Sequence, residues 1–136
     1  MRRPMLVVLL PALALGVSAC GSSVSTAGFS GAEHEVAQTI ANLQSHATAG
    51  EEKKICGEDL AAALVAKLGG TKSCETAIKH QLAEVDSLEV SVQSVHVAAD
   101  GKSATAQVES IHEGKHGPST IALVKEGGKW RISGLA

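Results

Sequence analysis

Aromatic side chains are nearly absent from this 136-residue sequence, which has one Phe, one Trp and no Tyr. A hydrophobic core must therefore be built from Val, Leu, Ile and Ala, many of which are small. The sequence also lacks any cluster of basic residues, because 12 Lys and Arg are spread among 14 Asp and Glu. Nucleic-acid binding depends on clustered cations with aromatic stacking partners, so the composition argues against a nucleic-acid partner.

A long hydrophobic run is missing as well, since a membrane-spanning helix takes about 20 apolar residues. The longest apolar run, residues 5–17, has 13 residues and is interrupted by Pro11 and Gly16. It follows Arg2 and Arg3. A short apolar segment behind basic residues is typical of a secretory signal peptide. The sequence therefore predicts a signal peptide over residues 1–19.

The end of this segment, Val17-Ser18-Ala19-Cys20, resembles the lipobox of bacterial lipoproteins, in which small residues precede an invariant cysteine. The resemblance implies cleavage before Cys20 and a diacylglyceryl thioether on its thiol, and two or more acyl chains anchor a protein stably. We expect a protein anchored by lipid to the outer, extracytoplasmic face of the cell membrane, with residues 20–30 as lipidated cysteine and flexible tether. The alternative is an ordinary secretory cleavage site with an incidental cysteine.

Cleavage before Cys20 would leave 117 residues, the usual size of one domain. This part keeps all 14 acidic residues and ten of the 12 basic ones, which gives a formal charge of −4. No internal repeat or second domain boundary appears in it. We therefore expect residues 31–136 to fold as a single domain.

The first two thirds of this domain show apolar residues at helical spacing. Ser30 and Glu33 have the form of a capping box, which predicts a helix over residues 31–47. A second, shorter helix is expected over residues 57–68, and a third from Ser73, which can cap it. The three apolar stripes are Val36, Ile40 and Leu43, then Leu60, Leu64 and Leu68, then Cys74, Ile78, Leu82 and Val85.

After Asp86 the apolar period changes from 3.6 to 2, which indicates strands. A slip in the alternation near Gln93-Ser94 predicts a β-bulge in the first strand. The third strand is expected over residues 121–124. Turns that would separate four strands lie at Asp100-Gly101, at residues 114–118 and at Gly127-Gly128. The sequence thus predicts an α+β fold with N-terminal helices packed on a four-stranded antiparallel sheet.

This order of elements, and the final Gly-Lys-Trp-Arg-Ile strand from Gly128 to Ile132, resemble the NTF2-like superfamily, in which a curved sheet wraps a helical layer as a cone. The domain is also similar to small secreted members that follow a lipobox, some of them described as lumazine-binding-like or as domains of unknown function. The resemblance covers residues 31–136. A cystatin-like or other α+β meander is the rival topology, because element order alone does not fix the fold.

Two thiols remain once Cys20 is lipidated, those of Cys56 and Cys74, and an exported protein meets an oxidising compartment. A disulfide between them would tie the second predicted helix to the third. A redox pair or a metal site is the alternative, but redox sites usually have Cys-x-x-Cys spacing and zinc needs more ligands nearby. We therefore predict a structural Cys56–Cys74 disulfide.

The six histidines are scattered along the sequence, at His34, His46, His80, His96, His112 and His116. His112 and His116 flank Glu113 in a predicted turn, where two imidazoles and a carboxylate suit a transition metal. A solvated loop is the favoured interpretation, because ligand spacing across a Gly turn is loose and no supporting shell is visible. We expect no metal and no cofactor. His96, between Val95 and Val97, is expected to face solvent.

The NTF2-like resemblance also implies an enzyme alternative of the isomerase or dehydratase type, in which an Asp base or an Asp–His pair lies inside the cone. His112 is in phase with the predicted inward residues of its strand and is the one histidine placed for that role. It has no evident carboxylate partner. We therefore expect a protein that is not an enzyme and has no catalytic residues.

Binding remains as the expected activity, either of a small apolar ligand inside the cone or of an envelope protein partner. The residues expected to line such an apolar cavity are Ile78, Leu82, Ala104, Ala106, Val108, His112 and Trp130. Such a cavity would suit a lipid-like ligand. The simpler alternative is that these side chains pack together as the core.

Intact mass measurement of the chain purified from membranes tests the anchor and the disulfide together. We expect the mass of residues 20–136 plus acyl chains, with two thiols that react with an alkylating reagent only after reduction. A mass without lipid would contradict the anchor, and two thiols that react without reduction would contradict the disulfide.

Overall fold

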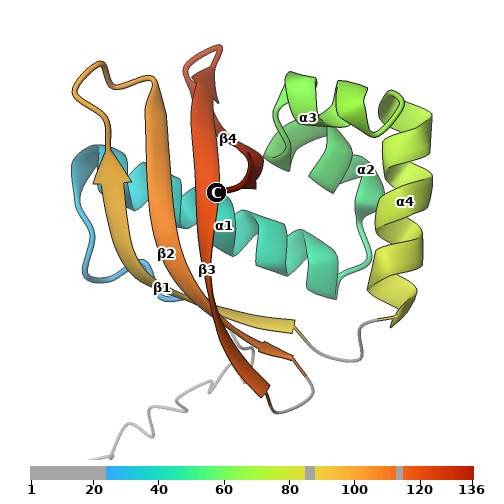
Figure 1. Ribbon diagram of the computed structural model, residues 1–136, viewed down its shortest axis with the longest axis horizontal. Helices are drawn as coiled ribbons and strands as arrows, with labels where there is room; N and C mark the ends of the chain where they lie inside the picture. Colours follow the sequence, from blue (N-terminus) through green and yellow to red (C-terminus); the bar gives the residue numbers. More distant parts are fainter. Residues whose placement is uncertain (1–23, 85–87, 113–114) are drawn as a thin grey trace, which may run out of the picture.

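The computed structural model describes residues 24–84, 88–112 and 115–136, with the backbone alone described at residues 88 and 112. The predicted signal peptide and Cys20 lie outside the described residues, as does Glu113 of the hypothetical metal site. Helical segments come first and four strands follow (Figure 1). The elements are α1 (Gly31–Thr48), α2 (Glu52–Lys54), the π-helix η1 (Ile55–Asp59), α3 (Ala62–Lys67), α4 (Thr71–Glu84), β1 (Leu88–Val97), β2 (Ser103–His112), β3 (Lys115–Glu126) and β4 (Lys129–Leu135).

The sheet is an antiparallel meander in the order β1-β2-β3-β4. Its curvature is visible in Figure 1, where the strands bend across α1 and the shorter helices gather beside β4. The register shifts between Val92 and Ser94 of β1, so the predicted bulge at Gln93-Ser94 is confirmed. A bulge increases local twist and bends the strand. The expected turns at Asp100-Gly101 and Gly127-Gly128 also connect strands as predicted.

The core lies between α1 and the inner face of the sheet. Val36 and Ile40 of α1 are 0% and 1% exposed, and they belong to one buried cluster with Ala106 and Leu123 of the sheet. Small side chains such as Ala106 leave room for the bulkier aliphatic residues of the helix. Burying a Val or Ile side chain contributes roughly 1.5–3 kcal/mol, so this packing compensates for the shortage of aromatic residues.

A buried glutamine fastens α1 to the edge of the sheet. Gln44 is 5% exposed, and its side-chain Oε1 accepts a hydrogen bond from the backbone N–H of Val90 at 2.9 Å. Val90 lies in the edge strand β1, where this N–H would otherwise be without a strand partner. The contact satisfies a backbone donor and fixes the position of α1 across the sheet.

The predicted second helix is wrong in its start and in its continuity. Helical structure begins at Glu52 and is interrupted at Leu60, which has an extended backbone with φ −92° and ψ 141°. The cause is a contact with the sheet, because Leu60 forms a parallel bridge with Ile132 and the Ala61 N–H donates to the Ile132 carbonyl at 2.8 Å. Leu60 and Ala61, which the apolar spacing assigned to a helix, therefore pair with the edge of β4.

The expected caps of the other helices also need correction. Ser30 occupies the N-cap of α1 with an extended backbone, but its side chain makes no capping hydrogen bond. The helix α4 begins at Thr71, before the predicted Ser73 cap. Gly69 and Gly70 both have positive φ, at 93° and 96°, so the chain reverses there and the helix starts directly afterwards.

The third strand is longer than the predicted 121–124, because β3 begins at Lys115 and includes Pro118. The backbone carbonyl of Thr120 accepts a hydrogen bond from the Ala136 N–H on the β4 side of β3. Backbone groups two residues apart in a strand point to the same side, so the backbone nitrogen of Pro118 also faces the β4 side. The β4 pairing ends at Ile121–Leu135. Pro118 pairs with Glu109 of β2, and on the β4 side it has no strand neighbour among the described residues, so its missing N–H disrupts no ladder.

The Cys56–Cys74 disulfide is present and joins η1 to α4, with a Cα–Cα distance of 6.1 Å. Both cysteines are buried in the core cluster, at 4% and 0% exposure. The prediction of a structural bridge is confirmed. Across residues 24–84, 88–112 and 115–136, no helix is both long and apolar enough to cross a membrane.

Replacing both cysteines by alanine is expected to lower the free energy of unfolding by about 3 kcal/mol, the loop-entropy contribution of a bridge of this length. The bridged residues are separated by 18 positions. Urea unfolding followed by Trp130 fluorescence measures the change. If the urea concentration at the unfolding midpoint and the denaturant slope were both unchanged in the double variant, a stabilising role of the disulfide would be contradicted.

Candidate functional site

The residues predicted to line an apolar cavity are distributed through the core. Ala104, Ala106, Val108 and Trp130 are members of the buried cluster, and Ile78 and Leu82 are partly buried against it. The side chain of His112 is outside the described part. Of these seven residues, Trp130 also lines a separate, polar groove on the outside of the core.

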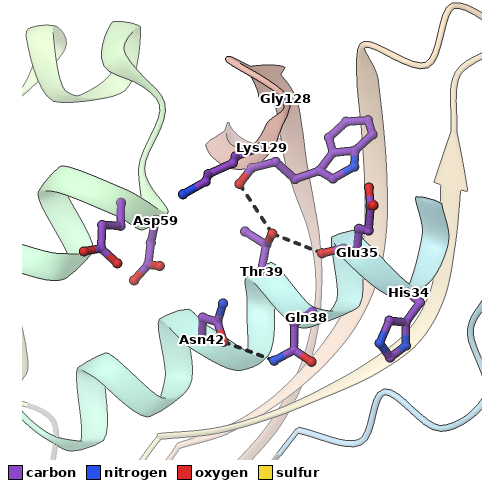
Figure 2. A pocket seen from close by; sticks show the side chains of 10 residues that line it. His34, Glu35, Gln38, Thr39, Asn42, Asp59, Gly128 and Lys129 are labelled. Carbon is purple, nitrogen blue, oxygen red and sulfur yellow. Dashed lines mark hydrogen bonds between the residues drawn. The ribbon is translucent and has the colours of Figure 1, made fainter. Parts of the chain in front are cut away.

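This groove has a volume of about 370 Å³ and lies between the solvent face of α1, the π-helix η1 and the β3–β4 turn (Figure 2). Polar and charged side chains dominate its wall. The lining residues are His34, Glu35, Gln38, Thr39, Asn42, Glu58, Asp59, Gly128, Lys129 and Trp130.

Helical spacing brings the α1 side chains of the groove into one row. Glu35, Gln38, Thr39 and Asn42 are at i, i+3, i+4 and i+7, the same spacing as a buried stripe but on another face of the helix. Gln38 Nε2 donates to Asn42 Oδ1 at 3.1 Å, which orients both amides along the row (Figure 2).

Thr39 connects the row to the strand above it. Its Oγ1 lies 3.1 Å from the Glu35 carbonyl and 3.4 Å from the Trp130 carbonyl, so its one hydroxyl proton is shared between backbone acceptors. The contact spans 91 residues of sequence. It holds the roof of the groove, which begins at the β3–β4 turn, against the floor formed by α1.

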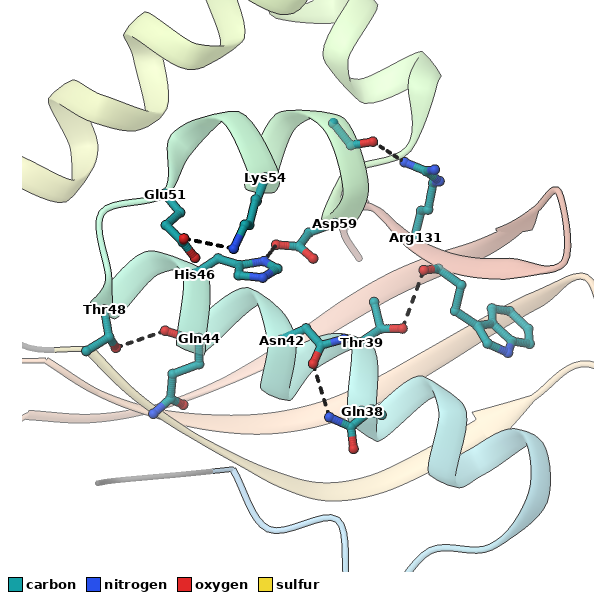
Figure 3. Close-up of polar contacts among 12 residues, drawn as sticks. Gln38, Thr39, Asn42, Gln44, His46, Thr48, Glu51, Lys54, Asp59 and Arg131 are labelled. Atoms are coloured by element: carbon teal, nitrogen blue, oxygen red, sulfur yellow. Dashed lines mark hydrogen bonds and ion pairs between the residues drawn. The ribbon is translucent and has the colours of Figure 1, made fainter. Parts of the chain in front are cut away.

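Asp59 is the buried acid of the site. Its exposure is 4%, and its Oδ2 is 2.7 Å from the Nδ1 of His46, which comes from the last turns of α1 (Figure 3). Asp59 is the final residue of the π-helix, where the Leu60 N–H bonds to the Ile55 carbonyl. Such wider turns are uncommon and occur often at functional sites. The π-helix thus brings a carboxylate to the groove wall and into contact with α1.

Burial raises the pKa of the Asp59 carboxyl above its ordinary value, because it disfavours the charged form. The hydrogen bond and the charge of His46 act in the opposite direction. Glu58 raises the pKa further, and Arg131 lowers it. Arg131 is itself held beside η1, since its Nη1 donates to the Gly57 carbonyl at 2.7 Å (Figure 3).

Trp130 forms the wall at the other end of the groove. It is 4% exposed, and Lys125 Nζ lies 5.6 Å from its ring centroid. Lys125 also pairs with the Glu35 carboxylate at 3.7 Å. Within the described part of the chain, the Trp130 Nε1–H is a buried donor without an acceptor. A buried donor left unpaired typically costs about 1–3 kcal/mol, so this indole nitrogen is a distinctive feature of the wall.

Among the histidines whose side chains are described, His34 lines the groove, and His80, His96 and His116 do not. His116 Nδ1 lies 2.7 Å from Glu109 Oε1 across the β2–β3 pair, and His96 is exposed, as predicted from its strand phase. No group of three metal-binding side chains is found among the described residues.

His46 and Asp59 were not singled out from the sequence. They are 13 positions apart and belong to helices whose relative position depends on the tertiary fold. The polar row on α1 was not singled out either. The one available signal was that Asp59 lies among apolar residues of the second predicted helix, close to Ile55 and Leu60.

Comparison with known proteins identifies the fold but no relative. No protein-family model matches the sequence, and no curated protein gives a significant match. A designed protein of NTF2 fold is 19% identical with a TM-score of 0.50, over 74% of this chain and 95% of the other. A de novo designed protein with a curved β-sheet is 21% identical with a TM-score of 0.38, over 48% of this chain and 61% of the other.

The likeness to the first design shows the fold alone. With four antiparallel strands curved around α1, the chain has an α+β, NTF2-like fold, so the predicted fold class is confirmed. The fold does not assign a function, which must be argued from the groove.

Replacing Asp59 by Asn is expected to raise the free energy of unfolding near neutral pH, because the amide keeps a hydrogen-bonding group beside His46 without a buried charge. A raised folded-state pKa means that Asp59 contributes stability below its unfolded pKa and loses that contribution as pH rises through the folded pKa. The gain should therefore shrink as the pH falls toward the ordinary Asp value of about 3.9.

Urea unfolding at about pH 7.5 and about pH 4 measures this difference, with Glu75→Gln on α4 as a control for loss of one negative charge. A variant that is less stable than the parent at the higher pH would show that the charged His46–Asp59 contact stabilises the fold.

Proposed function

We propose that this chain is a lipid-anchored protein of the cell envelope, of a non-catalytic type, which binds a polar ligand in the groove along α1. The observation that carries the proposal is the groove itself, an open site of about 370 Å³ beside a buried carboxylate. Burying a carboxylate lowers the stability of a fold, and binding sites commonly keep groups that are unfavourable for stability.

The start of the described chain supports close anchoring. Val24 is 8% exposed, and the Thr26 carbonyl accepts hydrogen bonds from Phe29 N–H and, at 3.4 Å, His34 Nδ1. Val24 follows the proposed lipidation site, Cys20, by four residues, and four residues reach at most about 14 Å. A lipid on Cys20 would therefore keep the domain next to the membrane surface, with little freedom to move away.

The state of the groove side chains supports binding over catalysis. Among the described lining residues, Thr39 carries the one hydroxyl, and its proton is engaged with backbone carbonyls. His46 meets Asp59 from behind the wall and is not a lining residue itself. These groups position one another, as expected for a rigid recognition surface.

A polar ligand fits this site better than the small apolar ligand that the sequence suggested. The inner faces of α1 and the sheet are packed against each other through Val36, Ile40 and Leu123. The groove offers amides, carboxylates and an ammonium group beside the apolar atoms of its wall. An envelope protein that inserts a polar segment is compatible with it.

Hydrogen-exchange mass spectrometry on the lipidated chain in nanodiscs tests the site with three probes: the tripeptide Gly-Gly-Gly, trehalose and palmitate. We expect a polar probe to slow exchange in peptides that cover residues 34–42 and 128–130. The double variant Gln38→Ala, Asn42→Ala should abolish the effect, while the exposed Gln93→Ala should not.

Protection by palmitate alone, in peptides that cover β2 and α4, would contradict the groove and restore the apolar cavity. Protection by none of the three probes would also count against a small polar ligand.

A further inference from the structure

We propose that the ligand of this groove is an extended segment of a partner protein that carries lysine or arginine. This inference rests on the proposed function, since it names the chemistry of the ligand for the same site. Three features of the wall carry it: an excess of carboxylates, a row of amides, and an indole donor that lacks an acceptor.

The charge of the wall favours a cation. Glu35, Glu58 and Asp59 contribute carboxylates, and among the described lining residues Lys129 contributes the one permanent positive charge. Figure 2 shows the Lys129 side chain extending from the β3–β4 turn toward the segment of Asp59. Lys125 pairs with Glu35 and His46 contacts Asp59, so Glu58 is the lining carboxylate without an ion pair among the described residues. A basic side chain of a ligand would pair with it.

The Glu35 end of the groove already holds a cation that a ligand can replace. Lys125 Nζ is 3.7 Å from Glu35 Oε2, with side chains 33% and 58% exposed, so this pair is weak and exchangeable. The same lysine lies against the Trp130 ring at 5.6 Å. A basic ligand side chain that pairs with Glu35 would release Lys125 from that carboxylate, beside the face of the Trp130 ring.

The Trp130 indole lacks a hydrogen-bond acceptor among the described residues, and a peptide supplies acceptors. Trp130 Nε1 has no partner among the described residues, and a backbone carbonyl of the ligand is a suitable one. The amides of Gln38 and Asn42 are donors and acceptors of the kind that pair with peptide groups. A simple polyamine offers cations but no such carbonyl.

The length of the row fits a short extended segment. Glu35 and Asn42 are seven residues apart on α1, which is about 10 Å along the helix axis. Three residues of an extended peptide have the same length, at about 3.3 Å each.

Fluorescence of Trp130 tests the proposal, since the protein contains one tryptophan and that residue lines the groove. The lipidated chain in neutral-lipid nanodiscs is titrated with N-acetylated, C-amidated Gly-Lys-Gly-Lys-Gly, with the matched Gly-Glu-Gly-Glu-Gly and with Gly-Ser-Gly-Ser-Gly. We expect saturable change with the lysine peptide, weakened by added salt. The glutamate peptide should bind at least about tenfold more weakly.

Two variants locate the site. Glu58→Gln and Asp59→Asn should each weaken binding of the lysine peptide about twofold to fivefold. Glu75→Gln on α4, which removes the same charge away from the groove, should leave the affinity unchanged. The Asp59→Asn variant is expected to fold at least as stably as the parent. Weaker peptide binding by this variant would therefore not be explained by loss of folded protein.

Each other outcome overturns a defined part of the proposal. Equal binding of the lysine and serine peptides would overturn the cationic requirement while leaving the groove as a binding site. Equal loss in Glu58→Gln and Glu75→Gln would reduce the effect to overall charge. Absence of any response to all three peptides, together with a response to trehalose in the exchange experiment, would overturn the peptide ligand and retain the proposed function.

Discussion

The packing of α1 against the inner face of the sheet is the contact on which the rest of the structure depends. One face of the helix, with Val36 and Ile40, fills the curved sheet. The adjacent face, with Gln38 and Asn42, is thereby presented to solvent as the floor of the groove. A single amphipathic helix therefore supplies both the core of the domain and its candidate recognition surface.

The position of the π-helix is set from two sides. The disulfide attaches Cys56 to α4, and the Leu60–Ala61 segment pairs with Ile132 of β4. Asp59 lies between these two attachments. Its carboxylate can therefore meet His46 across the gap between helices without depending on loop flexibility. The disulfide and the backbone hydrogen bonds thus hold Asp59 in position, without extensive side-chain packing. A binding site needs groups that are positioned in advance in this way.

The sequence was sufficient where local patterns and the tertiary structure agree. Alternation of apolar residues predicted the meander and its bulge, and the two remaining thiols predicted the disulfide. It was insufficient where the sheet overrides a local preference, as at Leu60, whose helical spacing yields to pairing with β4. The turn predicted at residues 114–118 is wrong for a related reason. Pro118 is compatible with a strand at a position where the β4 side has no paired strand among the described residues.

The candidate site depended even more on tertiary information. The amides of the groove have a spacing that a solvated helix would share, and it is η1 and the β3–β4 turn beside them that complete the cavity. His46 and Asp59 become partners through the π-helix, a local geometry that no composition rule signals. The buried, unpaired nitrogen of Trp130 is likewise invisible without coordinates.

The proline at the unpaired stretch of β3 also has a consequence for how copies of this protein behave when crowded. Over residues 115–119, ahead of its pairing with β4, the strand β3 has no neighbour on the β4 side among the described residues, and an open strand edge is a template for edge-to-edge aggregation. Pro118 removes a donor from that edge, and the exposed Lys115 and His116 precede it. Molecules concentrated side by side on one surface would thus be protected from polymerising through their sheets.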